Sequence, residues 1–228
     1  MPTVLITGAS DGIGRALVDR YLADGWEVIA HGRRPLADVE PSMPGSVDYV
    51  RHDLRDGVDA VTASLPDALD LAILNAGVGF VAPPGATDPS AITELVQVNT
   101  IAPLRLAHAL HSRLAAGRGR LVLIGSTASR GAHGDFAVYA ATKAALAGAA
   151  RSLRLEWDGS VDVQVIHPGP TATGMHERAG LPETWHRRFF TPAATVADAI
   201  SASIESGRAS TRFGLGFLVR HALSRGRT

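Results

Sequence analysis

The amino-acid sequence predicts an α/β fold in which a parallel sheet is doubly wound, with helices on both faces. Short apolar runs rich in β-branched residues alternate along the chain with longer helical patterns, which is typical of successive βαβ units. Several of these runs, such as residues 71–74 and 121–124, are apolar throughout. Strands of that kind are expected where both faces of a sheet are covered.

The predicted elements follow one another without a composition break that would mark a second domain, so we expect one domain over residues 1–228. The strands are expected at 3–7, 27–31, 47–51, 71–75, 119–125 and 162–167. The helices are expected near 14–24, 57–65, 90–115 and 137–157. Ligands of such sheets bind beyond the carboxyl ends of the strands, so residues that follow the strands are the candidates for a site.

The first strand is followed directly by a turn that carries Gly8, Gly12 and Gly14, and then by a helical pattern. Glycines let the backbone approach a diphosphate, and the first turn of a helix offers free N–H groups to it. The spacing is Gly-x-x-x-Gly-x-Gly. A tight loop without a ligand would show the same glycines, so the turn alone does not establish a nucleotide site.

Tyr139 and Lys143 lie one helical turn apart in a predicted helix, and Lys143 is the only lysine in the chain. A compact ammonium beside a phenol favours the phenolate, so we expect Lys143 to lower the pKa of Tyr139 and make its hydroxyl useful in proton transfer. An amphipathic helix with a buried tyrosine and an exposed lysine would give the same spacing. Ser126 stands 13 residues before Tyr139 at the end of a predicted strand.

Taken together, these motifs resemble the short-chain dehydrogenase/reductase family over most of the chain, up to about residue 208. The resemblance implies a Rossmann-type sheet of about seven strands in the order 3-2-1-4-5-6-7. It implies four catalytic positions, which are Asn99, Ser126, Tyr139 and Lys143. The cofactor-binding positions that it implies, together with Tyr139 and Lys143, are Gly8, Ser10, Gly12, Ile13, Gly14, Asp53, Leu54, Asn75, Ala76, Gly77, Pro168, Gly169 and Thr173.

The end of the second strand indicates which cofactor is preferred. Arg33 and Arg34 follow that strand, and no acidic residue lies between Glu27 and Asp38. Arginine there pairs with the 2′-phosphate of NADP, whereas a carboxylate would bind the ribose of NAD. We therefore expect NADP(H), with NAD(H) as the second choice. Asp11 points the other way, because some NADP-preferring relatives carry a basic residue at that place.

The resemblance implies hydride transfer between the nicotinamide and a carbonyl or alcohol carbon. Ser126 would hydrogen-bond the substrate oxygen, Tyr139 would donate the proton, Lys143 would also hold the nicotinamide ribose, and Asn99 would position a water. A strand-terminating role for Ser126 and a backbone-satisfying role for Asn99 are the alternatives. For the whole protein, the alternative is an NADP(H)-binding regulatory or scaffolding protein with little turnover.

Composition excludes several other classes. The 22 basic and 22 acidic residues cancel, so the overall charge gives no case for nucleic-acid binding. Without cysteine, disulfides and cysteine-based metal or nucleophile chemistry are excluded. No apolar stretch is long enough to span a membrane, and no signal-like segment begins the chain. We expect a cytoplasmic protein. Histidines 167, 176 and 186 match no zinc spacing.

Two segments are expected to vary from the family pattern. Residues 174–195 fall where the family places a substrate lid, and Met175, Trp185, Phe189 and Phe190, with Phe80 and Val81, suggest an apolar wall for an apolar carbonyl or alcohol substrate. Helix packing would also use these side chains. Residues 211–228 predict a strand and a short basic helix, which would cap the domain, contact another subunit or touch an anionic membrane. The resemblance implies a homodimer or homotetramer.

Overall fold

The computed structural model describes residues 1–39, 42–79, 88–130, 136–179 and 190–214. Its elements, in chain order, are β1 (Thr3–Thr7), α1 (Gly12–Ala23), β2 (Glu27–Gly32), η1 (Leu36–Asp38), β3 (Asp48–Arg51), α2 (Asp59–Ala63), β4 (Leu71–Leu74), α3 (Pro89–Val96), η2 (Gln97–Ile101), α4 (Ala102–Gly117), β5 (Arg120–Ile124), η3 (Thr127–Arg130), α5 (Ala137–Glu156), β6 (Asp162–His167), β7 (Thr171–Ala172), α6 (Met175–Arg178), β8 (Thr191–Pro192), α7 (Ala193–Glu205) and β9 (Ser210–Arg212).

Seven strands form one sheet in the order β3-β2-β1-β4-β5-β6-β9, and every adjacent pair is parallel. This confirms the predicted doubly wound sheet and its strand order. The six strands expected from the sequence are all present, and the seventh is β9, which begins one residue before the strand expected in the tail. The basic helix expected after it lies outside the described residues.

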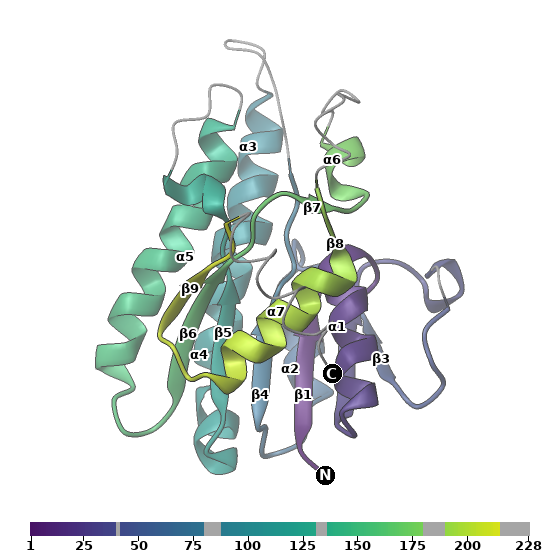
Figure 1. Cartoon of the computed structure of the whole chain (residues 1–228), viewed down its shortest axis with the longest axis vertical. Helices are drawn as coiled ribbons and strands as arrows, with labels where there is room; N and C mark the ends of the chain where they lie inside the picture. The colour runs from purple at the N-terminus through teal and green to yellow at the C-terminus, as the bar shows by residue number, and fades with distance from the viewer. Residues whose placement is uncertain (40–41, 80–87, 131–135, 180–189, 215–228) are drawn as a thin grey trace, which may run out of the picture.

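The two faces of the sheet are covered by different helices (Figure 1). Side chains alternate along β1, so Leu5 packs with α4 and α5 on one face while Val4 and Ile6 pack with α1 and α7 on the other. All five residues of β1 are buried. Because both faces are covered by apolar side chains, polar groups are left to gather at the carboxyl ends of the strands.

Two helical regions differ from the sequence prediction. The single helix expected over residues 90–115 is interrupted by a π-helical turn, η2, between α3 and α4. A π-turn of this kind is often found at functional sites, and here it contains Asn99. A second difference is α7, a helix not expected from the sequence, whose buried residues include Val196, Ala197, Ile200 and Ile204 and repeat at helical spacing.

Candidate functional site

The turn between β1 and α1 depends on glycine at two positions. Gly8 has a φ of +67°, and a Cβ there would lie 2.7 Å from the Cα of Ala76. A Cβ on Gly14 would overlap the carbonyl of Gly8 and lie 2.7 Å from Nδ2 of Asn75. The backbone therefore packs closely enough that only glycine fits, and Gly12 and Ile13, at the start of α1, line the cavity described below.

Thr7 and Asn75 join the carboxyl ends of β1 and β4. The Thr7 hydroxyl accepts hydrogen bonds from the backbone N–H groups of Asn75 and Ala76, both at 3.0 Å. In return, Nδ2 of Asn75 donates to the Thr7 carbonyl at 3.0 Å. This arrangement holds residues 75–77 beside the glycine turn.

A cavity of about 560 Å³ opens at the carboxyl ends of the strands. The residues expected from the sequence that line it are Gly8, Ser10, Gly12, Ile13, Arg33, Arg34, Asp53, Leu54, Asn75, Ala76, Gly77, Ser126, Tyr139, Lys143, Pro168, Gly169 and Thr173. Gly14 and Asn99 do not line the cavity but contact residues that do. Gly14 packs against Gly8 and Asn75, and Asn99 hydrogen-bonds to the backbone of Val78. The size of the cavity lies within the range of small-molecule and cofactor sites.

Ser126, Tyr139 and Lys143 meet at one end of this cavity. Ser126 follows β5, while Tyr139 and Lys143 lie on the same face of α5. The side chains of Ser126 and Tyr139 are hydrogen-bonded, and the Lys143 ammonium donates to the Ile124 carbonyl at 3.0 Å. Lys143 is 4% exposed. A hydroxyl pair and a buried amine thus share one wall.

The electrostatics of this trio differ from the sequence expectation. Burial raises the pKa of Tyr139, and its hydrogen bond with Ser126 opposes the rise only in part. Burial also lowers the pKa of Lys143 from 10.5 to about 8. Lys143 is not among the groups that lower the pKa of Tyr139. The sequence suggested the opposite direction because it gave no measure of how deeply the α5 residues are buried.

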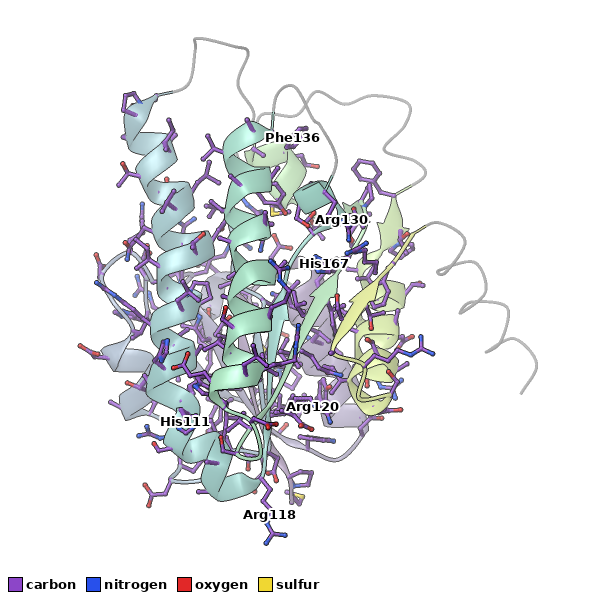
Figure 2. The ribbon with its side chains drawn as sticks, turned by 90° about the vertical axis from the view of Figure 1, so that its left-hand side faces the viewer. His111, Arg118, Arg120, Arg130, Phe136 and His167 are labelled. Atoms are coloured by element: carbon purple, nitrogen blue, oxygen red, sulfur yellow. The ribbon has the colours of Figure 1, made fainter. Side chains whose placement is uncertain are left out.

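His167 holds the loop that carries Ser126. Its Nδ1 lies 3.3 Å from the Ser126 carbonyl, and burial lowers its pKa, so the neutral ring with a proton on Nδ1 is the donor. The Thr127 N–H also donates to the Pro168 carbonyl at 2.9 Å. Figure 2 shows His167 below Arg130 and Phe136, in the same half of the molecule; Phe136 immediately precedes α5. Sequence reasoning left His167 as an isolated histidine.

The basic residues expected to select the cofactor flank the other end of the cavity. Arg33 is more than half exposed and lies 3.8 Å from Glu94. Arg34 lies 3.4 Å from Asp11, and its backbone carbonyl accepts from the Tyr49 hydroxyl at 2.8 Å. Asp11, whose negative charge opposes a phosphate, is therefore paired with an arginine.

Asp53, one of the expected cofactor-binding residues, accepts hydrogen bonds from two guanidinium nitrogens of Arg55. Its Oδ2 accepts from the Arg55 guanidinium at 2.6 Å, and the pair lowers the pKa of Asp53. Arg55 also lies 3.5 Å from Glu94. The Asp53 carboxylate is thus ionised at neutral pH, and Asp53 lines the cavity.

Several cavity residues were not singled out as site residues from the sequence. They are Asp11, His31, Gly32, His52, Val78, Gly79, Val98, Ile124, Gly125, Thr127, Ala128, Phe136, Pro170, Thr171, Arg178 and Ala179. Among the expected wall residues, Met175 and Phe190 line the cavity, whereas Phe80, Val81, Trp185 and Phe189 lie outside the described residues. No local motif marks Phe136 or Arg178, since each reaches the cavity through tertiary packing.

Two observations test whether a dinucleotide suits this cavity. The glycine turn offers a cradle that any Cβ at residue 8 or 14 would fill. Thr173 Oγ1 is buried and lacks a hydrogen-bond partner within the described part of the chain, and its residue lines the cavity. A buried hydroxyl without a partner is costly unless a ligand satisfies it. Both features fit a bound dinucleotide.

Other kinds of site find less support in the described residues. They contain no group of three or more His, Cys, Asp or Glu side chains arranged to hold a metal ion. Within the same residues, no helix combines the length and apolar character needed to cross a membrane.

Comparisons with known proteins agree with this geometry. A model of the short chain dehydrogenase family matches residues 2–183. The "Cyclic-di-GMP-binding biofilm dispersal mediator protein" of Escherichia coli is 31% identical over 193 residues, covering 78% of this chain and 76% of the relative. The "Serine 3-dehydrogenase" of Rhizobium radiobacter is 31% identical over 180 residues, covering 75% of this chain and 72% of the relative.

A solved structure is similar over the whole chain. The short-chain dehydrogenase from Sphingobium yanoikuyae in complex with NADPH is 28% identical, has a TM-score of 0.82, and is matched over 100% of this chain and 93% of its own. The family model alone covers well over half of the sequence. The chain therefore belongs to the short chain dehydrogenase family.

Proposed function

We propose that this protein is an NADP(H)-dependent oxidoreductase that transfers a hydride between the nicotinamide and a carbonyl or secondary alcohol substrate. The observation that carries the proposal is the convergence of Ser126, Tyr139 and Lys143 on the cavity that also holds the glycine turn. A hydroxyl pair beside a nucleotide cradle supplies what carbonyl reduction requires of the protein. When bound, the cofactor supplies or accepts the hydride.

The chain's own residues would manage the substrate oxygen and its proton. Ser126 and Tyr139 would donate hydrogen bonds to that oxygen, where negative charge develops during reduction. Burial raises the pKa of Tyr139 and so keeps it protonated, as a proton donor must be. Lys143, one turn along α5, would hold the nicotinamide ribose through its ammonium.

Preference for NADP(H) rests on Arg33 and Arg34, which line the cavity beyond β2. Arginines bind a phosphate dianion with two parallel hydrogen bonds and form weaker contacts with a neutral ribose hydroxyl. Asp11 offsets only part of the Arg34 charge, because its carboxylate lies 3.4 Å from Arg34 and closer, at 2.7 Å, to Arg178. NAD(H) remains the second cofactor to test.

The substrate we propose is apolar. Near Tyr139 the cavity is lined by Phe136, whose ring centroid is 6.4 Å from that of Tyr139. Met175, Ala179 and Phe190 also line it. Apolar and aromatic walls gain most from a ketone or aldehyde with hydrocarbon substituents. The carbonyl would then be the polar group that fixes its orientation.

The test is oxidation of NADPH and NADH by the purified protein with aromatic and aliphatic ketones, aldehydes, quinones and 3-oxoacyl compounds. Tyr139→Phe should lower turnover with NADPH by roughly a thousandfold, since it removes the proton donor, and should leave the Kd for NADPH within about threefold. Tyr21→Phe is the matched control, because Tyr21 is a buried tyrosine of the α1–α7 core. Unchanged turnover in Tyr139→Phe would refute the catalytic assignment.

A second candidate function is nucleotide-dependent regulation with little turnover. It draws support from the relative named for cyclic-di-GMP binding. Calorimetric titration with cyclic-di-GMP and with NADPH separates the two candidates. Tight cyclic-di-GMP binding, with no turnover of any carbonyl compound, would favour regulation.

We also propose that the protein forms a homodimer or homotetramer through α4 and α5. Ala141, Ala144 and Ala145 give α5 an exposed face of small side chains, which permits close helix approach. Light scattering during size-exclusion chromatography measures the mass directly. A monomer at micromolar concentration would contradict this proposal.

A further inference from the structure

The carboxylate of Asp11 joins three separate segments of the chain. Its Oδ1 accepts from the Gly12 N–H at 2.6 Å, which caps the start of α1. Its Oδ2 is shared by two guanidinium groups, that of Arg178 at 2.7 Å and that of Arg34 at 3.4 Å. Arg178 is the last residue of α6. Its contact with Asp11 therefore links α6 to the glycine turn, although the two residues are 167 positions apart in the sequence.

Gly174 leaves the room that Arg178 needs. A Cβ built on Gly174 would lie 2.7 Å from Nη1 of Arg178 and 3.3 Å from Oδ2 of Asp11. The φ of Gly174 is −63°, which any residue adopts. Glycine is therefore useful here for the space beside the guanidinium, and alanine would displace that group without straining the backbone.

Charge explains why this arrangement would favour an anion. A lone carboxylate at the start of α1 would repel a phosphate that approaches the free N–H groups of that helix. Two guanidinium groups against one carboxylate leave the cluster with net positive charge. Arginine has five N–H donors, and Arg178 is about half exposed with 51% of its side chain accessible. Arg178, Arg34 and Asp11 all line the same cavity.

We propose that Arg178 binds the diphosphate of the cofactor from α6, with Asp11 holding its guanidinium in place. The proposal rests on the proposed function, because it needs a dinucleotide in the cavity. The diphosphate is favoured over the 2′-phosphate because Asp11 and Gly12 begin α1, where a diphosphate is held in sheets of this kind. Thr173, which lies just before α6, also packs against Gly12. A Cβ built on Gly12 would lie 2.7 Å from the methyl group of Thr173.

The experiment measures the Kd of both NADPH and NADH by nicotinamide fluorescence, without any substrate. Arg178→Gln should raise the Kd of both NADPH and NADH by about tenfold. Each cofactor carries the diphosphate, and each would lose one charged hydrogen bond to it. Gly174→Ala should weaken both in the same way while all charges stay. Arg208→Gln is the matched control, since Arg208 is an exposed arginine that precedes β9 at the opposite edge of the sheet.

A double-mutant cycle tests the role of Asp11. Arg178→Gln should cost less in an Asp11→Asn background than in the wild type, because the guanidinium is no longer held by the carboxylate. Equal costs in the two backgrounds would refute the anchoring role. Circular dichroism melts of each variant exclude a folding defect as the source of any loss.

The remaining outcomes decide the assignment. A loss confined to NADPH would overturn the diphosphate contact and move Arg178 to the 2′-phosphate. Unchanged affinity for both cofactors in Arg178→Gln, with normal binding by the wild type, would sink this inference and leave the oxidoreductase proposal intact. Failure of the wild-type protein to bind either cofactor would refute both.

Discussion

The side chain of Asn99 pairs with both backbone groups of Val78. Its Oδ1 accepts from the Val78 N–H at 2.8 Å, and its Nδ2 donates to the Val78 carbonyl at 2.9 Å. Nδ2 also lies 3.3 Å from the hydroxyl of Thr142, which donates to the Tyr139 carbonyl at 2.7 Å. Asn99 is fully buried, so its amide connects the cavity wall at residue 78 to the face of α5 that carries Thr142.

Asn99→Ala should lower both stability and turnover. It removes a fully buried amide and leaves two partly buried backbone groups of Val78 without their partners, at a cost of about 2 to 4 kcal/mol in the free energy of unfolding. Because residues 77–79 and α5 would shift, kcat should fall as well. Chemical denaturation and steady-state kinetics measure the two effects.

Gln164→Ala is the control for that variant. Gln164 is also buried, and it donates to the Arg208 carbonyl at 2.9 Å, far from the cavity. It should lose stability with little change in kcat once folded. If both variants lose stability and neither loses kcat, Asn99 has a structural role only.

Two glycines should respond to alanine with opposite signs. Gly14→Ala places a methyl group against the Gly8 carbonyl and 2.7 Å from Nδ2 of Asn75, neither of which moves easily, so stability and NADPH affinity should both fall. Gly148→Ala lies inside α5 with only the Arg151 guanidinium nearby, at 3.8 Å. It should raise stability by about 0.5 to 1 kcal/mol through helix propensity. Thermal melts with and without NADPH compare them.

The sequence predicted the parts of the site that depend on local pattern. Gly8, Ser126 and Pro168 each follow an apolar strand, so their convergence at one edge could be expected from strand direction alone. Tyr139 and Lys143 share a helix face because they are one turn apart. The strand boundaries agreed to within about a residue for the same reason.

The rest depends on contacts between distant segments. Asn99, in the π-turn, hydrogen-bonds to Val78, which lies 21 residues earlier in the sequence. Asp11 and Arg178, which also pair, are 167 residues apart. The direction in which the pKa of Tyr139 shifts was also predicted wrongly, because the shift is caused by burial, which depends on how distant segments pack around the cavity. In each case the sequence identifies the residue but contains no local signal for its partner.

Arg33→Ser should change cofactor preference. Removing a guanidinium that would face the 2′-phosphate should raise the Kd of NADPH by roughly 10- to 100-fold and leave the Kd of NADH within about twofold of the wild-type value. The weakening should grow smaller at high salt, because exposed charges are screened. Arg55→Ser is a useful comparison, since Arg55 also lies near Glu94 but pairs with Asp53. Equal loss of NADPH and NADH affinity would contradict the role of Arg33.

Lys143→Met should stabilise the protein while abolishing its activity. The pKa of Lys143 is lowered from 10.5 to about 8 by burial, so below pH 8 the folded state carries the full cost of a buried charge, roughly 3 kcal/mol. Between pH 8 and 10.5 the unfolded chain binds more protons than the folded one, and wild-type stability rises with pH. The melting temperature of Lys143→Met should therefore exceed that of the wild type by roughly 6 to 12 °C at pH 7, with the gap closing towards pH 10. Leu146→Met on the same helix should show a difference independent of pH, and a pH-independent gap for Lys143→Met would mean that burial does not shift the pKa of Lys143.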